Sequence, residues 1–336
     1  MTPVQHPLAY IPSPPVNGFH IGPLFVHFYG LMYVIGITLA VLITQRRVRA
    51  AGGDASVVGD IAVWAVPAGI IGGRIYFDIT TPAQIPHVWY GVFAVWTGGL
   101  GIWGGVAAGA LVGVWRVKRR GLQVAPFADA VAPALLVAQA VGRIGNYFNQ
   151  ELYGRRTTMP WGLKISGHPG LYHPTFLYEL IFDLALAALL VWLGHHTKIK
   201  PPGLFALYVT GYSAFRIYEE SLRIDYSQHF AGLRLNTFVA SALTAAGIIW
   251  FIYTQRRKPA SVPEPPSEDD QPADQAGDDS ADTSPEAEAE ANPGAEDESA
   301  GTVPGKTGRA SLFPRQTPSR HRSMIGDDQL PVPPAT

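Results

Sequence analysis

Seven long apolar runs limit what this chain can fold into. They cover residues 24–44, 57–77, 92–115, 122–142, 174–193, 203–222 and 235–253. Each run is close to the roughly 20 residues that a helix needs to cross the hydrocarbon core of a bilayer. A buried helix of a soluble core could explain any one run, but seven in succession favour membrane helices, whose backbone polar groups are paired internally. The sequence therefore predicts an all-α, polytopic membrane protein with about seven transmembrane helices.

Basic residues follow the first, third, fifth and seventh runs and predict the orientation. They are Arg46, Arg47, Arg49, Arg116, Lys118, Arg119, Arg120, Lys198, Lys200, Arg256, Arg257 and Lys258. If every run spans once, all four clusters lie on one side of the membrane, and the excess of Lys and Arg marks that side as cytoplasmic. The N-terminus is then outside and the C-terminus is cytoplasmic. Residues 1–18 contain five prolines and no basic segment, so we expect no cleaved signal peptide.

The fourth run is the least regular of the seven. It contains Pro126, Asp129 and Pro133. Proline removes a helical hydrogen bond, and irregular backbone at membrane depth is tolerated only where protein or a cavity lines it. We expect this run to be broken or re-entrant. The third run instead has a glycine at every fourth position over 101–113, which favours close helix packing.

Residues 259–336 differ in composition from the rest of the chain. Charged residues make up 15% of the sequence, and many of them lie here in an acidic block rich in Pro and Ala, followed by scattered Lys and Arg. Such a segment cannot bury enough apolar surface to offset the entropy lost on ordering. We expect a membrane domain at 1–258 and a disordered, acidic, Pro/Ala-rich cytoplasmic tail at 259–336. The alternative is a docking tail or a basic membrane contact near its end.

A glycine-rich polar motif, VGRIGNYFNQELYGR, occupies residues 141–155 at the end of the fourth run. Its polar members and glycines are Arg143, Asn146, Asn149, Glu151, Arg155, Gly142, Gly145 and Gly154. Charges beside hydrocarbon are costly and usually functional, and glycines let backbone or ligand approach closely. A cation, two amides and a carboxylate next to a membrane segment indicate a pocket for a polar headgroup. The predicted topology places this motif at the outer leaflet.

The sixth run contains a second polar set. Tyr212, Arg216 and Glu220 are spaced four residues apart, so they lie along one face of a helix. A structural ion pair between Arg216 and Glu220 is as reasonable as a functional role. Arg143 and Arg216 together suggest an anion clamp, because guanidinium binds phosphate in a bidentate manner and keeps its charge when partly desolvated. In a membrane protein, a phospholipid is the obvious source of that phosphate.

Other candidates are weaker when taken alone. Glu179 and Asp183 share a face of the fifth run, where two like charges need water or cationic partners, such as Arg74 or the two arginines of the suggested clamp. Arg74 by itself would be a snorkelling anchor. Tyr29 by itself would belong to an interfacial aromatic belt.

The absence of Cys excludes disulfides, a thiolate nucleophile and Cys-ligated zinc in the chain. The ten His residues show no spacing typical of a metal site. We therefore expect no metal, no cofactor and no nucleic-acid partner.

Six blocks resemble, in order, motifs of the bacterial prolipoprotein diacylglyceryl transferases. They are HFYGLMY (27–33), GGRIYF (72–77), WTGGLGIWGG (96–105), GRIGNYFNQELYGR (142–155), HPTFLYE (173–179) and GYSAFRIYEESLR (211–223). The blocks span roughly residues 16–253, and six of them in family order are highly specific. The tail at 259–336 lies outside the resemblance.

The resemblance implies a reaction. Such enzymes move the diacylglyceryl group of phosphatidylglycerol to the thiol of a cysteine in the lipobox of a prolipoprotein signal peptide, the first step of bacterial lipoprotein maturation. A thioether forms and glycerol phosphate leaves. The implied protein is a multi-pass transferase of the bacterial plasma membrane, with its transferase domain at 1–258. Its implied partners are phosphatidylglycerol, other membrane lipids and prolipoproteins, and the nucleophile comes from the substrate.

The resemblance also implies roles for individual residues. Arg143 matches the arginine that holds the phosphatidylglycerol headgroup, and Arg216 matches the catalytic arginine. We expect Glu151 to orient Arg143 or to assist the thiol. The expected substrate-binding set is completed by Asn146, Gly154, Tyr29, Tyr212, Glu220, Arg74 and Trp103.

Two positions depart from the family pattern. Trp103 stands where the family usually has a histidine that is a candidate base or headgroup contact, and an indole cannot accept that proton. Thiol activation could instead use Glu151, Tyr29 or a thiol pKa lowered beside Arg216. The last run begins Arg234–Leu235–Asn236 where many members have Ser-x-Gly-Gln, so the role of Asn236 is open.

Two other functional classes stay open on the residues alone. A transporter would have discontinuous helices with charges near the midplane, often in inverted repeats. We see no such repeat, and the charges cluster toward the outer side. A passive lipid-binding scaffold is the other class. Release of glycerol phosphate that depends on an acceptor thiol would distinguish an enzyme from both.

Overall fold

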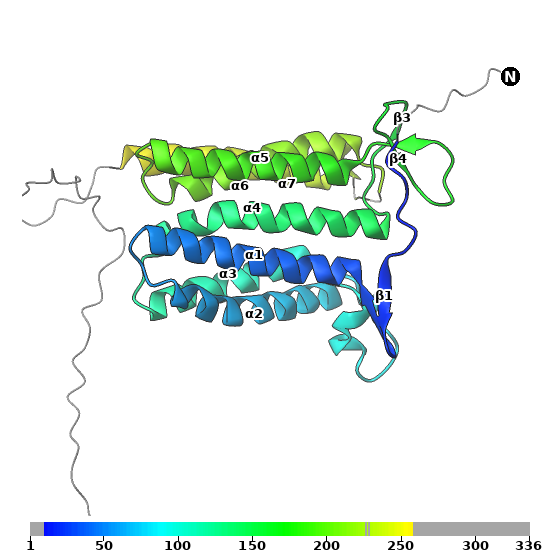
Figure 1. The fold of residues 1–336 in the computed structure, drawn as a ribbon, viewed down its shortest axis with the longest axis horizontal. Helices are drawn as coiled ribbons and strands as arrows, with labels where there is room; N and C mark the ends of the chain where they lie inside the picture. Colours follow the sequence, from blue (N-terminus) through cyan, green and yellow to red (C-terminus); the bar gives the residue numbers. More distant parts are fainter. Residues whose placement is uncertain (1–9, 226, 228, 258–336) are drawn as a thin grey trace, which may run out of the picture. The chain divides into compact units, whose positions relative to one another are not determined.

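The computed structural model describes residues 10–225, 227 and 229–257, and this part of the chain contains seven long helices (Figure 1). They are α1 (Phe28–Ala50), α2 (Ser56–Thr80), α3 (Ile102–Arg119), α4 (Val124–Asn149), α5 (Thr175–His196), α6 (Gly203–Leu222) and α7 (Leu235–Arg256). Each apolar run contributes one helix, so the helical prediction is confirmed. The tail predicted at 259–336 lies outside the described residues.

Within the described residues, five helices are long and apolar enough to cross a membrane, namely α1, α2, α4, α5 and α7. The other two are more polar, because α3 ends in three basic residues and α6 contains an arginine followed by two glutamates. The fold is therefore that of a polytopic membrane protein.

Helix α4 lies at the centre of the packing, against α1 on one side and α5 and α6 on the other, while α2 packs on α3 and α6 on α7 (Figure 1). Small residues let α2 and α3 approach closely. A Cβ added to Gly104 would lie 2.2 Å from the carbonyl oxygen of Gly72, and one added to Gly105 would lie 3.2 Å from that of Gly69. This contact confirms the close packing predicted from the glycine spacing of the third run.

Two kinds of polar residue lie at opposite ends of the helices. At one end, the Asp60 carboxylate near the start of α2 pairs with Arg116 (2.7 Å) and Arg120 (2.8 Å), in and just after the last turn of α3. At the opposite end, Arg143 near the end of α4 meets Glu179 near the start of α5. The motif residues therefore gather at the end of the helices away from the basic clusters.

The expected break in the fourth run is wrong, because α4 is continuous from Val124 to Asn149. Pro126 lies in the first turn, where backbone N–H groups have no helical partner in any case. Pro133 is internal and cannot donate to the carbonyl of Asp129, four residues earlier. Arg47 of α1 donates to that carbonyl through Nη2 at 3.3 Å, and to the next one through Nε at 3.1 Å. The Arg47 side chain of α1 thus supplies the hydrogen bond that the carbonyl of Asp129 lacks because of Pro133.

The first and third apolar runs do not begin as helices, although each run is expected to be helical. Residues Leu24–His27 form β2, which pairs with β1 (Gly18–Ile21) across a turn in which Gly22 has φ of 58°. The third run starts in the short 3-10 turns η2 (Gly91–Phe93) and η3 (Val95–Thr97), and α3 begins only at Ile102. Gly98 and Gly99, with φ of 88° and 82°, separate these turns from the helix because positive φ interrupts it.

The remaining short elements join the helices at the end that holds the motif residues. They are η1 (Pro82–Gln84), the three-stranded sheet of β3 (Arg156–Thr157), β5 (Leu171–Tyr172) and β4 (Leu163–Lys164), and the hairpin of β6 (His229–Phe230) and β7 (Leu233–Arg234). The β6–β7 hairpin leads directly into α7, and Asn236 in the first turn of α7 donates to Glu220 near the end of α6 at 3.4 Å.

Candidate active site

The centre of the site is the carboxylate of Glu179, whose side chain is 0% exposed. Its Oε2 lies 3.2 Å from Nε of Arg143 on α4 and 3.5 Å from Nη1 of Arg216 on α6. Its Oε1 accepts a hydrogen bond of 2.9 Å from the Tyr212 hydroxyl. Helices α4 and α6 both end at this side of the bundle, so the two arginines meet on one oxygen. The expectation that Glu179 has cationic partners is confirmed, and they are Arg143 and Arg216.

Arg216 has two further carboxylate partners on its own helix, Glu219 and Glu220, which follow it by three and four residues. Both carboxylates are buried, whereas the Arg216 side chain is 18% exposed and that of Arg143 is 20% exposed. A buried charge is tolerated only when it is paired, so the two glutamates and the Arg216 guanidinium hold one another in place. Asp183, one turn below Glu179, is buried, and its oxygens have no hydrogen-bond partner among the described residues.

A second chain of contacts connects Arg143 with Glu151. Nη1 of Arg143 donates to Oδ1 of Asn146 at 3.1 Å, and Nδ2 of Asn146 donates to Oε1 of Glu151 at 2.8 Å. Asn149 donates to the same Glu151 oxygen at 3.3 Å. The chain can turn back in this way because Gln150 ends α4 in the left-handed region, with φ of 54°. Glu151 therefore contacts Arg143 through Asn146 rather than directly.

Gly154 lies where the segment after α4 passes between the start of α5 and the end of α6. Its N–H donates to the carbonyl of His173 at 2.9 Å, and it forms an isolated antiparallel bridge with Arg223. A Cβ here would lie 2.8 Å from Cβ of His173 and 3.1 Å from the carbonyl oxygen of Leu222. The absence of a side chain thus allows three segments of the site to pack together.

Comparison with known proteins identifies the family of this arrangement. Residues 17–253 match the family described as prolipoprotein diacylglyceryl transferase. The chain belongs to this family. The matched region contains all of the predicted site residues and ends before the tail.

Several individual transferases are similar over most of their length. A phosphatidylglycerol–prolipoprotein diacylglyceryl transferase of Bifidobacterium adolescentis is 46% identical over 272 residues, which cover 74% of this chain and 81% of the relative. Transferase 1 of Streptomyces coelicolor is 43% identical over 272 residues, covering 78% of this chain and 79% of the relative. The transferase of Frankia alni is 44% identical over 259 residues, covering 74% and 68%.

The two aromatic residues predicted for the diacylglyceryl transferase site, Tyr29 and Trp103, differ in their position relative to it. Tyr29, in the first turn of α1, packs on Gly145, where a Cβ would lie 2.7 Å from the tyrosine ring. Its hydroxyl lies 3.0 Å from that of Tyr33. Trp103, in the first turn of α3, is 47% exposed. Tyr29 is therefore next to the motif of α4, whereas Trp103 lies on the separate α2–α3 pair.

Arg74 is placed differently from the other predicted substrate-binding residues. The residue is buried in the last turns of α2, 3.1 Å from Asp78. Its guanidinium donates to five carbonyls of the connection to α3, at distances of 2.6 to 3.3 Å. These acceptors are Gly91, Val92, Ala94, Gly98 and Gly99. The connection between α2 and α3 is therefore folded around the Arg74 guanidinium.

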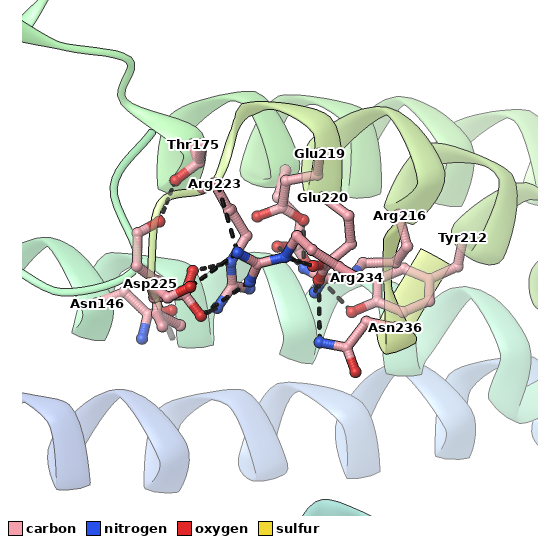
Figure 2. A network of polar contacts seen from close by, with 12 residues as sticks. Asn146, Thr175, Tyr212, Arg216, Glu219, Glu220, Arg223, Asp225, Arg234 and Asn236 are labelled. Atoms are coloured by element: carbon pink, nitrogen blue, oxygen red, sulfur yellow. Dashed lines mark hydrogen bonds and ion pairs between the residues drawn. The ribbon is translucent and has the colours of Figure 1, made fainter. Parts of the chain in front are cut away.

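The sequence reading missed Glu219 and Arg234 as members of the site. Figure 2 shows Arg234, at the end of β7, lying between Glu220 and Asp225. Its Nε donates to Oε2 of Glu220 at 2.7 Å, and Nη2 donates to Oδ2 of Asp225 at 3.2 Å. Asn236 also donates to Glu220, at 3.4 Å. The end of the sixth run has more carboxylates than arginines, and this surplus could have indicated that a further cation lies nearby.

Asp225 connects this hairpin to the end of α6. Burial would raise the pKa of its carboxyl, but hydrogen bonds and charge from Arg223 and Arg234 outweigh that effect, and the pKa is lowered. Arg223 donates to both Asp225 oxygens, at 2.7 and 3.0 Å. The carboxylate therefore remains ionised at neutral pH and holds Arg234 in place.

Proposed function

We propose that this chain transfers the diacylglyceryl group of phosphatidylglycerol to the lipobox cysteine of prolipoproteins and releases glycerol phosphate. The observation that supports this most directly is the meeting of Arg143 and Arg216 on Glu179, with each arginine side chain partly exposed. The family membership and the names of the relatives point to the same substrates.

The two arginines are suited to the leaving group of this reaction. Guanidinium groups bind phosphate oxygens through pairs of N–H donors. The acceptor sulfur forms a bond to the glycerol carbon while the bond from that carbon to the phosphate oxygen breaks. The electron pair leaves with glycerol phosphate, so negative charge grows on the phosphate. Arg143 and Arg216 stabilise that charge more in the transition state than in the bound lipid, which lowers the barrier.

The thiol proton needs an acceptor, and Trp103 cannot be one. We propose that the Glu151 carboxylate accepts it, or that Arg216 lowers the thiol pKa so that the proton goes to water and the thiolate forms on binding. Glu151 has a second role in this scheme, because its contact with Asn146 orients Arg143. Tyr212 and Glu220 position the arginine pair from α6.

We also propose that all seven helices span the plasma membrane, with the N-terminus outside, the C-terminus cytoplasmic and the site at the outer leaflet. The separation of the basic clusters from the motif residues supports this orientation. The sequence has no Cys, so single cysteines introduced into loops can be labelled without background. Labelling by an impermeant maleimide is expected at Thr157 and not at Gly121, and the reverse pattern would invert the topology.

The transfer itself is tested by reconstituting the protein with radiolabelled phosphatidylglycerol and a lipobox peptide. A peptide with Cys→Ser is the control, and free glycerol phosphate is measured alongside. We expect peptide lipidation and glycerol phosphate release in equal amounts, both absent with the Ser peptide. Arg143→Ala and Arg216→Ala should each reduce the rate by about 100-fold or more. Lipid binding without release would indicate a scaffold, and solute uptake without a lipid product would indicate a transporter.

A further inference from the structure

Arg234 contacts the predicted catalytic arginine through one shared carboxylate. Glu220 binds Arg216 through Oε1 and Arg234 through Oε2, so the two guanidiniums lie on opposite oxygens of a side chain that is 0% exposed. On its other side, Arg234 donates to the Asp225 carbonyl at 2.7 Å and pairs with the Asp225 carboxylate at 3.2 Å. Arg234 is thus fixed between α6 and the loop that precedes the β6–β7 hairpin (Figure 2).

These contacts change the charge that a phosphate would meet. Around the arginine pair lie the carboxylates of Glu179, Glu219 and Glu220, which outnumber Arg143 and Arg216. A phosphate that approaches this cluster meets carboxylates as well as guanidinium groups, and the low dielectric makes the repulsion between anions strong. Arg234 adds a cation on Oε2 of Glu220 and so offsets the charge of that carboxylate.

We propose that Arg234 is a positioning residue for this reaction. By donating to Oε2 of Glu220, it fixes that carboxylate and so keeps Arg216 oriented toward the phosphate. Its positive charge also weakens the electrostatic attraction between Glu220 and Arg216. The proposal rests on the transferase function proposed above and extends it to a residue outside the six sequence blocks.

The contacts argue against direct lipid contact by Arg234. Its Nε, Nη1 and Nη2 all donate to protein oxygens, and its side chain is 12% exposed. A role limited to closing the hairpin would need only the Asp225 contacts. The 2.7 Å bond to Glu220 is the additional feature that connects the hairpin to Arg216.

The test compares Arg234→Gln, Arg234→Lys, Glu220→Gln and the double variant Glu220→Gln/Arg234→Gln in the full-length protein. Each is assayed with phosphatidylglycerol vesicles and the lipobox peptide, and its melting temperature is measured. Arg120→Gln, which loses an ion pair at the opposite end of the helices, is the matched control. We expect Arg234→Gln to lower kcat about tenfold with the KM of the peptide unchanged, a size typical of residues coupled in one network. Arg234→Lys keeps the charge without the forked donors and should lose about threefold.

The double variant identifies the route of the effect. If Arg234 acts through Glu220, the loss in Glu220→Gln/Arg234→Gln is smaller than the product of the two single losses. Losses that multiply, or an Arg234→Gln variant as active as Arg120→Gln, overturn the proposal. A wild-type kcat in Arg234→Lys overturns it even if Arg234→Gln does not fold. Absence of lipid transfer by the wild-type protein would instead refute the proposed function.

Discussion

Replacing Glu179 with Gln should both destabilise the protein and disorder its arginine pair. The substitution keeps the shape of the side chain, and the amide oxygen can still accept the hydrogen bond from Tyr212. It removes the charge that lies 3.2 Å from Arg143 and 3.5 Å from Arg216. The amide N–H₂ would also face guanidinium donors, so at least one donor loses its acceptor.

The size of the effect follows from these two contacts. At an effective dielectric constant of about 20, each charge pair at this distance has about 5 kcal/mol of Coulomb attraction. Part of this is offset, because a neutral amide costs less to bury and Arg216 keeps Glu219 and Glu220. Removing one partner of a buried pair typically costs about 3–5 kcal/mol, and the offset places Glu179→Gln near 3 kcal/mol. That corresponds to a fall in melting temperature of roughly 6–12 °C for a domain of this size.

The assay is thermal unfolding in detergent, followed by the lipid-transfer rate below the transition. Asp60→Asn is the matched control, because Asp60 is also shared by two arginines, Arg116 and Arg120, but its side chain is 23% exposed. Exposed pairs contribute little, so its melting temperature should change much less. We expect kcat of Glu179→Gln to fall at least about tenfold, since misplaced catalytic groups are costly. Equal thermal shifts in the two variants, or a wild-type kcat in Glu179→Gln, would refute this account of the site.

Three further variants test other parts of the structure. Gly154→Ala should cost about 1–3 kcal/mol and lower the melting temperature, because its Cβ would lie 2.8 Å from His173; an unchanged melting temperature would show that the three segments are not tightly packed. Arg74→Gln should expose the loop at 91–99 to chymotrypsin, because each buried carbonyl left unpaired costs about 1–3 kcal/mol; cleavage at the wild-type rate would contradict this. Burial and the charge of Arg155 lower the pKa of His173. At pH values below the ordinary histidine pKa of about 6.5, the unfolded chain therefore binds this proton more readily than the folded protein, and the free energy of unfolding falls. His173→Asn removes this group and should reduce the fall in melting temperature between pH 7 and pH 5. An unchanged slope would indicate that His173 does not contribute.

Much of this fold could be predicted from the sequence because length and polarity alone determine a membrane helix. The neighbourhood of Arg143 and Arg216 followed as well, since alternating helix directions bring the ends of the fourth and sixth runs to the same side. The continuity of α4 could not be predicted, because the partner of the carbonyl freed by Pro133 is Arg47, 86 positions earlier along the chain. The contacts of Arg74 could not be predicted either, because its acceptors are backbone carbonyls, which every residue has.

The carboxylates of this site raise the question of why the proposed phosphate-binding centre contains so many anions. Two uncompensated arginines in a low-dielectric site would bind a phosphodiester strongly, but they would hold the more highly charged product more strongly still. In the proposed mechanism, Glu179 competes with the phosphate for both arginines and so favours release of glycerol phosphate, whereas Arg234 offsets the carboxylate beside Arg216 and favours binding of glycerol phosphate. The two residues should therefore act in opposite directions on product affinity. Inhibition by added glycerol phosphate should become stronger in Glu179→Gln and weaker in Arg234→Gln, and a shift in the same direction for both would mean that charge balance does not control release.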